Sequence, residues 1–566
     1  MTVEVADRTR RRLNRRLKAA VFAVCFVLYL AVGYWLQVHH GFIMGDTLSR
    51  VVATQSVVFS RDPHLAAIGF IFTPVAAMVQ IPAILFAPLW PDIAARAFCG
   101  TIMSAAFMAG GATQILGMGT DRGLPRTYSM AITALFALNP MIVFYGSNGM
   151  SEAPFIFFMA WAVRRLIMWM VDDDVHHLVA AGGIAMGLAY LTRYDALACI
   201  AAAGLVVAAT TYVRAPEPPR GRRAILDMLI ISGPGVLAFL GWAAAGWLIT
   251  GEAFAQFTSQ YGNSAILEQS GQSAPTFVDG FVFSATCTLL LAPMLVPLTL
   301  WVVVRRWGRP NWPVVIVPLA VFGAALLFQS VSYATGSTFP FLRFFIVSIP
   351  LTACLAMLAV PDGVFVTPVR RGRHAPDPVD AAGQRRSRFT YVAVATIVAA
   401  GIPVTVYGMG QPGHAPQEYG LGAILSPDPA DTSGKKAVER RIARTFGTER
   451  KIAEHLDNLD LPDSSVITDT VYGFGILAAS KRPKMFVIPS DPDFTELLNA
   501  PTENGIRYLL AVPPLGRGAS DALNLRYPTL YDTGAEIATL ELEIPNDGDG
   551  QPDWRLYRVF NRVAGS

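Results

Sequence analysis

The stretch LAAIGFIFTPVAAMVQIPAILFAPLW, residues 65–90, decides the fold of this chain, because counting it as a membrane span reverses the orientation of everything after it. It contains Pro74, Pro82 and Pro88, and Pro91 follows directly. Proline removes a backbone donor and breaks helices, and freed backbone groups cannot stay unpaired in lipid. We therefore predict two or three short helices that lie along the membrane interface.

The composition around this stretch is that of an integral membrane protein. Of 566 residues, 53% are hydrophobic and 15% are charged, which is too few charges for a soluble protein of this size. Eleven further apolar runs are mostly long enough to cross a hydrocarbon core about 30 Å thick. They lie near residues 18–37, 94–117, 127–146, 153–171, 178–192, 196–213, 225–249, 281–304, 311–330, 344–360 and 390–408. We expect about eleven transmembrane helices.

The distribution of arginine supports a non-spanning segment 65–90. With that segment outside the bilayer, one side of the membrane receives the basic N-terminus, Arg122, Arg126, Arg164, Arg165, Arg214, Arg220, Arg222, Arg223, Arg305, Arg306, Arg309 and the basic cluster within 370–388. The other side keeps Arg50, Arg61, Arg96, Arg193 and Arg343 before the tail. Because positive charge is retained inside, we expect a multi-pass protein of the cell membrane with a cytoplasmic N-terminus.

Three parts follow from this topology. Residues 1–17 form a basic cytoplasmic N-terminus, and residues 18–408 form the transmembrane domain, in which 38–92 are the first outer loop. No A-x-A-like cleavage site follows the first apolar run, which is therefore interpreted as a retained signal anchor. Residues 409–566 form an outer tail. We find no internal repeat of the kind that divides a transporter into two halves.

The tail has the pattern of a small α/β domain. ERKIAEHLDNL (449–459) is typical of a helix, and SSVITD, MFVIPS, IRYLLAV and WRLYRVF are typical of short strands bounded by Pro, Asp and Gly. About 150 residues are enough for one domain of this kind. The predicted fold class is thus a polytopic α-helical membrane protein with interfacial helices in its first outer loop and a C-terminal extracytoplasmic α/β domain.

Two carboxylates on the outer side are candidate catalytic groups. Asp46 follows the first membrane helix, beside Arg50 and Arg61, and a carboxylate there can accept a proton from an acceptor hydroxyl. The alternative is a helix N-cap, since Asp precedes Thr-Leu-Ser-Arg. Glu152, in NGMSEAPF, lies on the same face, where a second acid can orient a substrate hydroxyl. The alternative for Glu152 is that it belongs to an ordinary capped turn, with Ser151 or Asn148 as the helix cap.

Basic and aromatic residues at outer helix ends form a second set of candidates. Arg193 and Arg343 offer planar guanidinium groups suited to a phosphate, although snorkelling toward the interface is common for arginine near a helix end. Tyr194 and Tyr333 are candidates for the same pocket, with an interfacial aromatic belt as the alternative. We also place His64 of the first loop in this substrate pocket.

No metal or other cofactor is expected. The five cysteines all fall inside apolar runs, and His39, His40 and His64 have no carboxylate or cysteine partner at metal-ligand spacing. The triplet Asp172 to Asp174 is similar to the acidic part of a nucleotide-sugar site, but it lies on the cytoplasmic side without companion acids, and we interpret it as a solvated turn. Asp469 and Tyr472 in the tail are interpreted as turn residues.

The order of motifs resembles the membrane glycosyltransferases of the GT-C class, which include dolichyl-phosphate-mannose mannosyltransferases, the lipid A aminoarabinose transferase and mycobacterial mannosyl- and arabinosyltransferases. The motifs are GD at 45–46, FTPVAAMVQIPAILF, NPMIVFYGSNGMSEAPFIFFMAW, LAYLTRYDAL and FLRFFIVSIPL. The resemblance covers most of residues 18–408. It implies a polyprenyl-phosphate-linked sugar donor, an inverting displacement, and a glycan, lipid or protein acceptor on the outer face.

The same resemblance implies residue roles. The first-loop aspartate, here Asp46, is the proposed base, Glu152 matches the acid of the next outer turn, and Arg343 matches the basic residue that binds the lipid phosphate. Many protein mannosyltransferases have a second acid directly after the first, and Thr47 stands there, which makes a protein acceptor less assured. We leave Arg50 and Arg61 as interfacial anchors. High Ala, Arg, Gly and Val usage is typical of a GC-rich genome, which favours mannose or arabinose as the sugar.

Two other functions compete with sugar transfer. A flippase or transporter for a lipid-linked sugar predicts charges buried in the middle of helices and two related halves, whereas the charges here gather at outer helix ends. A non-catalytic cell-envelope assembly protein would place no demand on Asp46. In each reading the partners are membrane lipids and no nucleic acid.

Overall fold

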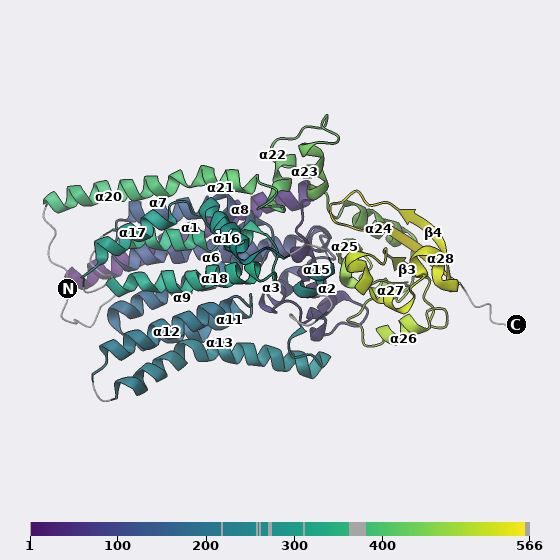
Figure 1. Cartoon of the computed structure of the whole chain (residues 1–566), viewed down its shortest axis with the longest axis horizontal. Coiled ribbons are helices and arrows are strands. Elements are labelled where there is room, and N and C mark those ends of the chain that lie inside the picture. The colour runs from purple at the N-terminus through teal and green to yellow at the C-terminus, as the bar shows by residue number, and fades with distance from the viewer. Residues whose placement is uncertain are drawn as a thin grey trace.

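The protein is an elongated molecule with a helical bundle at one end and the C-terminal domain at the other (Figure 1). The computed structural model describes residues 2–216, 219–255, 259, 262–269, 274–309, 312–360 and 381–560. Part of the predicted basic cluster, residues 370–380, lies outside these described residues.

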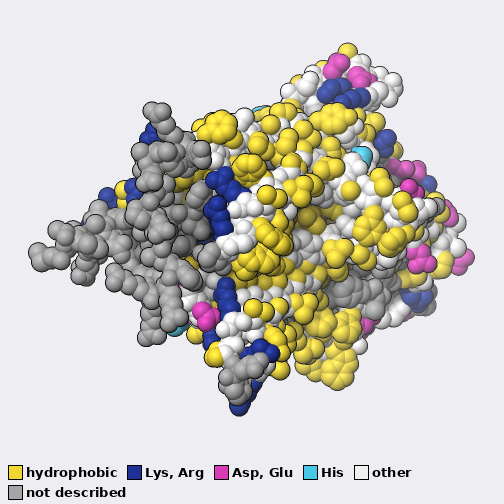
Figure 2. All heavy atoms as spheres, turned by 60° about the vertical axis from the view of Figure 1, so that its left-hand side comes forward, with side chains coloured by type: hydrophobic (Ala, Val, Ile, Leu, Met, Phe, Trp, Pro, Cys, Tyr) yellow, Lys and Arg dark blue, Asp and Glu magenta, His cyan; other side chains and the backbone are white. Residues whose placement is uncertain are grey.

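Seven helices in the described residues are long and apolar enough to cross a membrane. They are formed by α1 with η1 (Thr2–Gly33, Tyr34–His39), α6 (Phe98–Asp121), α9 (Glu152–Asp172), α12 (Ala196–Arg214), α13 (Arg220–Thr250), η4 with α18 (Trp312–Val315, Ile316–Ala334) and α20 with α21 (Ala381–Ala400, Ile402–Met409). Figure 2 shows a broad band of hydrophobic side chains on one face of the molecule, bordered by Lys and Arg at one edge. The protein is therefore a polytopic helical membrane protein.

Two bent helix pairs bring the number of candidate spans to nine. The pair α7 and α8 (Arg126–Ala137, Pro140–Ser147) bends by 64°, and the pair α16 and α17 (Phe277–Leu291, Leu295–Arg306) bends by 78°. Proline explains both bends: Pro140 begins α8, where Asn139 caps the helix by accepting from the Met141 N–H at 3.0 Å, and Pro293 lies in the second break.

By length and composition the chain thus has seven to nine candidate spans in its described part instead of the expected eleven. The remaining two runs form shorter apolar helices. One comprises α10, η3 and α11 (Val175–Leu178, Val179–Met186, Gly187–Tyr190), and the other η5 and α19 (Leu342–Phe345, Ser348–Leu358). Every residue of α19 is buried, so its apolar character serves the protein core, which the sequence alone cannot distinguish from contact with lipid.

The loop that follows the first span forms short helices, as the prolines predicted. After α2 (Gly45–Phe59), residues 65–90 contain η2 (Leu65–Ile68), α3 (Val75–Met78) and α4 (Ile81–Ile84). Pro74 is the N-cap of α3, and α4 has proline in its first turn. The helix α5 (Asp92–Ala95) follows.

The C-terminal domain contains a five-stranded mixed sheet of order β2-β1-β3-β5-β4. Its strands are β1 (Val466–Ile467), β2 (Phe486–Val487), β3 (Tyr508–Ala511), β4 (Ala538–Ile544) and β5 (Trp554–Val559). The strand β1 pairs in parallel with β2 and β3, and the remaining pairs are antiparallel. The four predicted strands and the predicted helix, α24 (Gly447–Asn458), are confirmed, whereas β4 was not predicted.

Further helices of this half of the chain are η6 (Glu418–Leu421), α22 (Gly422–Leu425), α23 (Lys435–Ala443), α25 (Thr470–Ala479), η7 (Pro483–Met485), α26 (Phe494–Asn499), η8 (Gly516–Ser520), α27 (Ala522–Arg526), α28 (Leu530–Thr533) and η9 (Gly534–Glu536). Near η8 lies α15 (Asn263–Gln269), which belongs to the loop after α13.

The helix α2 packs the loop after the first span against the C-terminal domain. Leu48 and Val51 of α2 belong to the same hydrophobic core as Phe474 and Leu477 of α25. At the end of the helix, Arg61 donates to the Asp493 carboxylate at 2.8 Å and to Asp491 at 3.2 Å. Arg61, expected to be an interfacial anchor, thus pairs with the C-terminal domain.

Candidate active site

The carboxylate of Asp46 lies at the start of α2 and faces the interior of the molecule. The helix is preceded by Met44 in extended conformation, with no side-chain hydrogen bond to the first turn, so Asp46 is not the N-cap. Its Oδ2 accepts from Nη2 of Arg343 at 2.9 Å, and 39% of the Asp46 side chain is exposed. The interpretation of Asp46 as a helix N-cap is therefore wrong. The guanidinium of Arg343 orients the Asp46 carboxylate.

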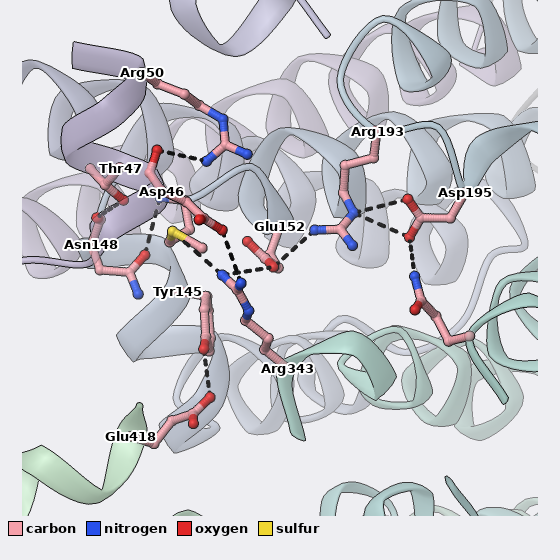
Figure 3. A network of polar contacts seen from close by, with 12 residues as sticks. Asp46, Thr47, Arg50, Tyr145, Asn148, Glu152, Arg193, Asp195, Arg343 and Glu418 are labelled. Atoms are coloured by element: carbon pink, nitrogen blue, oxygen red, sulfur yellow. Dashed lines mark hydrogen bonds and ion pairs between the residues drawn. The ribbon is translucent and has the colours of Figure 1, made fainter. Parts of the chain in front are cut away.

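Arg343 is the centre of the charged network that Figure 3 draws. It lies in η5 with its side chain 5% exposed, between the rings of Phe341 and Phe344 at 5.0 and 5.2 Å from their centroids. Besides Asp46, its Nη1 lies 3.9 Å from Oε1 of Glu152. A guanidinium in such apolar surroundings is retained where carboxylates compensate it, and two carboxylates do so here.

Glu152 connects this arginine to a second one. As the first residue of α9, it is 2% exposed in its side chain and accepts from Nη1 of Arg193 at 2.9 Å. Its Oε2 is buried without a hydrogen-bond partner among the described residues. Arg193 also pairs with Asp195 at 3.2 Å, and Asp195 accepts from Gln329 at 3.0 Å. Four predicted site residues, Asp46, Glu152, Arg193 and Arg343, thus form one network.

The turn before α9 is held against α2 by Thr47. Its Oγ1 donates to the backbone oxygen of Asn148 at 2.8 Å, and Gly149 follows with φ +79°. A Cβ at Gly149 would meet the Thr47 side chain and the backbone of Gly100. The backbone at position 149 approaches Thr47 so closely that the turn requires glycine there. The contact between this turn and Thr47 places Glu152 beside Asp46.

Arg50 is a site residue that the sequence analysis placed at the interface. It is 7% exposed, one turn after Asp46 on α2, and donates to the backbone oxygen of Asp46 at 3.1 Å. Its guanidinium lies 4.3 Å from the centroid of the Phe72 ring. Within the described chain no carboxylate lies at ion-pair distance from it. In the sequence, only the spacing of Arg50 from Asp46 could have indicated that the two residues lie together in the site.

Electrostatics keeps Asp46 in its charged form. Burial by itself raises the pKa of this carboxyl group, but the charges of Arg343 and then Arg50 outweigh burial, so the pKa lies below the ordinary value of 3.8. A carboxylate with a lowered pKa is ionised at neutral pH and is available to accept a proton, although it is a weaker base than an ordinary aspartate.

A buried acid from the C-terminal part of the chain lies beneath this network. Glu418 of η6 is 2% exposed and accepts from the hydroxyl of Tyr145 at 2.5 Å. Burial raises the pKa of Glu418. No sequence motif indicated this pair, because its members are separated by 273 positions.

Of the other predicted residues, Tyr194 neighbours the network, whereas the contacts of Tyr333 and His64 lie elsewhere in the described structure. Tyr194 follows Arg193 and packs against Phe328 at 6.4 Å between ring centroids. Tyr333 stacks near Phe283 at 4.5 Å, and Nδ1 of His64 lies 2.7 Å from the backbone oxygen of Asp62. Among the contacts of the described residues, none joins Tyr333 or His64 to the charged network. Their roles in a substrate pocket remain predictions.

Two acids that the sequence analysis interpreted as turn residues, one in the tail and one in the acidic triplet, cap helices. Asp469 caps α25 by accepting from the Val471 N–H at 2.8 Å. Asp174 of the acidic triplet caps α10 in the same way, accepting from the His176 N–H at 3.0 Å. No group of three or more His, Cys, Asp or Glu side chains in the described residues is placed to hold a metal ion.

Comparison with solved structures identifies the fold. A crystal structure of ArnT from Cupriavidus metallidurans bound to undecaprenyl phosphate aligns over 97% of this chain and 99% of that chain, with a TM-score of 0.52 and 13% identity. The chain has the ArnT fold. The apo form of the same ArnT aligns over 97% and 98% of the two chains, with a TM-score of 0.52 and 16% identity.

At the level of fold, the similarity to ArnT confirms the resemblance to the GT-C class that the motifs indicated. An oligosaccharyltransferase from Archaeoglobus fulgidus aligns over 87% of this chain and 68% of that chain, with a TM-score of 0.38 and 10% identity. No protein-family model and no curated protein sequence matches the chain.

Proposed function

We propose that the protein transfers a sugar from a polyprenyl-phosphate-linked donor to an acceptor hydroxyl of a glycan, lipid or protein on the outer face of the cell membrane. The observation that carries the proposal is the contact of Asp46 with Arg343 at 2.9 Å, a carboxylate base next to a buried cation. The ArnT fold supports it, because that ArnT was crystallised with undecaprenyl phosphate.

In the proposed reaction the acceptor oxygen attacks the anomeric carbon from the face opposite the phosphate. The bond between this carbon and the phosphate oxygen breaks, the configuration inverts, and the proton of the hydroxyl passes to Asp46. The polyprenyl phosphate leaves with one additional negative charge, which Arg343 and Arg193 stabilise. Glu152 positions both arginines, since it contacts each of them.

We further propose that the sugar is mannose or arabinose and that the N-terminus is cytoplasmic. This places Asp46 and the C-terminal domain on the outer side, where a lipid-linked donor presents its sugar at membrane depth. The short helices of residues 65–90 lie beside α2 and are suited to guide a prenyl chain to the charged network.

The test is transfer by the purified protein. With labelled mannosyl- and arabinosyl-phosphate polyprenols, we expect wild-type protein to release polyprenyl phosphate and Asp46→Asn to be slower by about 10²- to 10⁴-fold. Asp92→Asn, in the same loop and paired only loosely with Arg96 at 3.9 Å, is the matched control and should retain activity.

An unchanged rate for Asp46→Asn would show that this residue is not the base. A wild-type protein that transfers no sugar from any such donor, but moves the donor across a proteoliposome membrane, would instead establish the transport function.

A further inference from the structure

A cavity of about 450 Å³ lies between the first outer loop and the C-terminal domain, away from the charged network. Its walls come from the end of α2, from residues 87–95 and from residues 479–484. Gln55 of its lining follows Asp46 by nine positions on α2, which corresponds to about 14 Å along the helix axis. The volume is in the range of small-molecule sites, about 300–1,000 Å³.

The lining combines an apolar wall with a cationic rim. Phe59, Ala87, Pro88 and Pro91 form part of the apolar wall, whereas Lys481, Arg482 and Lys484 bring three positive charges against the single carboxylate of Asp463. Arg482 is compensated by Asp460. Lys481 and Lys484 are exposed, and neither forms an ion pair with a residue that the structure describes. Two positive charges are thus free to bind an anion.

Aromatic residues place this cavity at the surface of the bilayer. Trp90 contacts Tyr34 at the end of the first span and Phe98 at the start of α6, with ring centroids 6.4 and 5.1 Å apart. Tryptophan and tyrosine gather where lipid headgroups begin. Leu89 beside Trp90 is 84% exposed, as expected of a side chain that enters lipid. The apolar wall therefore begins at the level of the acyl chains, and the two lysines lie toward the headgroups.

We propose that this cavity binds an anionic phospholipid of the bilayer, with its phosphate between Lys481 and Lys484 and the upper part of an acyl chain against Phe59, Pro88 and Pro91. Such a lipid would connect the first outer loop with the C-terminal domain. The site is separate from sugar transfer and requires only that the protein lies in a membrane.

Native mass spectrometry of the full-length protein tests the proposal. After removal of copurified lipid, the protein is exposed to phosphatidylglycerol, to phosphatidylcholine or to an equimolar mixture. We expect wild type to retain phosphatidylglycerol about tenfold over phosphatidylcholine, because each lysine adds to the attraction of an anionic headgroup. The double variant Lys481→Gln/Lys484→Gln should lose this preference, and Lys435→Gln/Lys451→Gln, which removes two lysines elsewhere, should keep it.

A third variant separates the cavity from surface charge. Ala95→Trp leaves both lysines in place and fills the lining, and we expect it to lose the retained lipid while its thermal unfolding stays cooperative. The proposal is overturned by equal loss in the two double variants, by retention of both phospholipids alike in wild type, or by unchanged binding in Ala95→Trp. With polyprenyl phosphate added as a third lipid, its retention over phosphatidylglycerol, if lost in Lys481→Gln/Lys484→Gln, would overturn the assignment to a bilayer phospholipid.

Discussion

Arg343 holds Asp46 in its charged form, and this dependence can be measured through pH. In the wild type the pKa of Asp46 is lowered, so the proposed base stays ionised as pH falls, and kcat/KM should remain level through the range in which an ordinary aspartate becomes protonated. In Arg343→Gln the largest lowering influence is lost, and burial then raises the pKa. We expect the acid limb of kcat/KM to move to higher pH, in addition to a lower rate.

Arg343→Lys is the control, because it keeps the charge and should leave the acid limb near its wild-type position. The free energy of unfolding also depends on pH through the lowered pKa of Asp46. Since the folded pKa of Asp46 lies below the unfolded one, its ion pair stabilises the protein above the unfolded pKa, and this contribution disappears as pH falls through the folded pKa. An acid limb that is identical in Arg343→Gln and wild type would separate Arg343 from the base.

Arg50 offers a positive charge that no carboxylate of the described chain occupies. We expect Arg50→Gln to lower kcat/KM for the lipid-linked donor by about 10- to 100-fold, as for the loss of a charged hydrogen bond to a phosphate. Arg96→Gln, in the same loop with a side chain that is 29% exposed, should stay within about twofold of wild type. Equal effects of both variants would show that only the charge of the loop matters.

Sequence reasoning selected the four residues of the network: Arg193 and Arg343 because arginine is unusual on the outer side, and Asp46 and Glu152 because of their acid chemistry and the order of motifs. It could not identify their pairing, since Arg343 and Asp46 are 297 positions apart. The roles of Arg50 and Glu418 depend on burial, and burial arises from tertiary packing that no local pattern records.

At the level of elements, the turn between α8 and α9 determines where Glu152 lies. Gly149→Ala places a Cβ at φ +79° against Thr47 and the backbone of Gly100. We expect a loss of about 1–3 kcal/mol in the free energy of unfolding. Gly241→Ala is the control, because nothing lies within 4 Å of a Cβ at that position of α13. Thermal unfolding in detergent measures both, and equal midpoints would contradict the steric argument.

The prolines of residues 65–90 were sufficient to predict short helices, because proline acts locally. Residues 178–192 and 344–360, predicted as spans, form shorter apolar helices, since apolar sequence indicates burial without saying whether lipid or protein provides it. The strand β4 was missed although its sequence, ATLELEI, alternates apolar and polar residues. Its burial does not follow that alternation, because residues 539–543 are all exposed.

For the molecule as a whole, the proposed sidedness can be tested by labelling. All five native cysteines are buried, so single introduced cysteines give a clear signal. Leu515→Cys in the C-terminal domain should react with a membrane-impermeant maleimide on intact cells. Arg222→Cys, in the first turn of α13, should react only after the cells are permeabilised. The reverse pattern would invert the topology.

The helix α2 contributes both to the proposed site and to the core of the C-terminal domain. It carries Asp46 at its start and shares a hydrophobic core with α25 along its length. The C-terminal domain cannot tilt away from the membrane helices without moving the proposed base. Positioning of Asp46 in the site and docking of the C-terminal domain are therefore coupled. A chain shortened at Met409 could keep its spans in the bilayer and still lack a positioned Asp46.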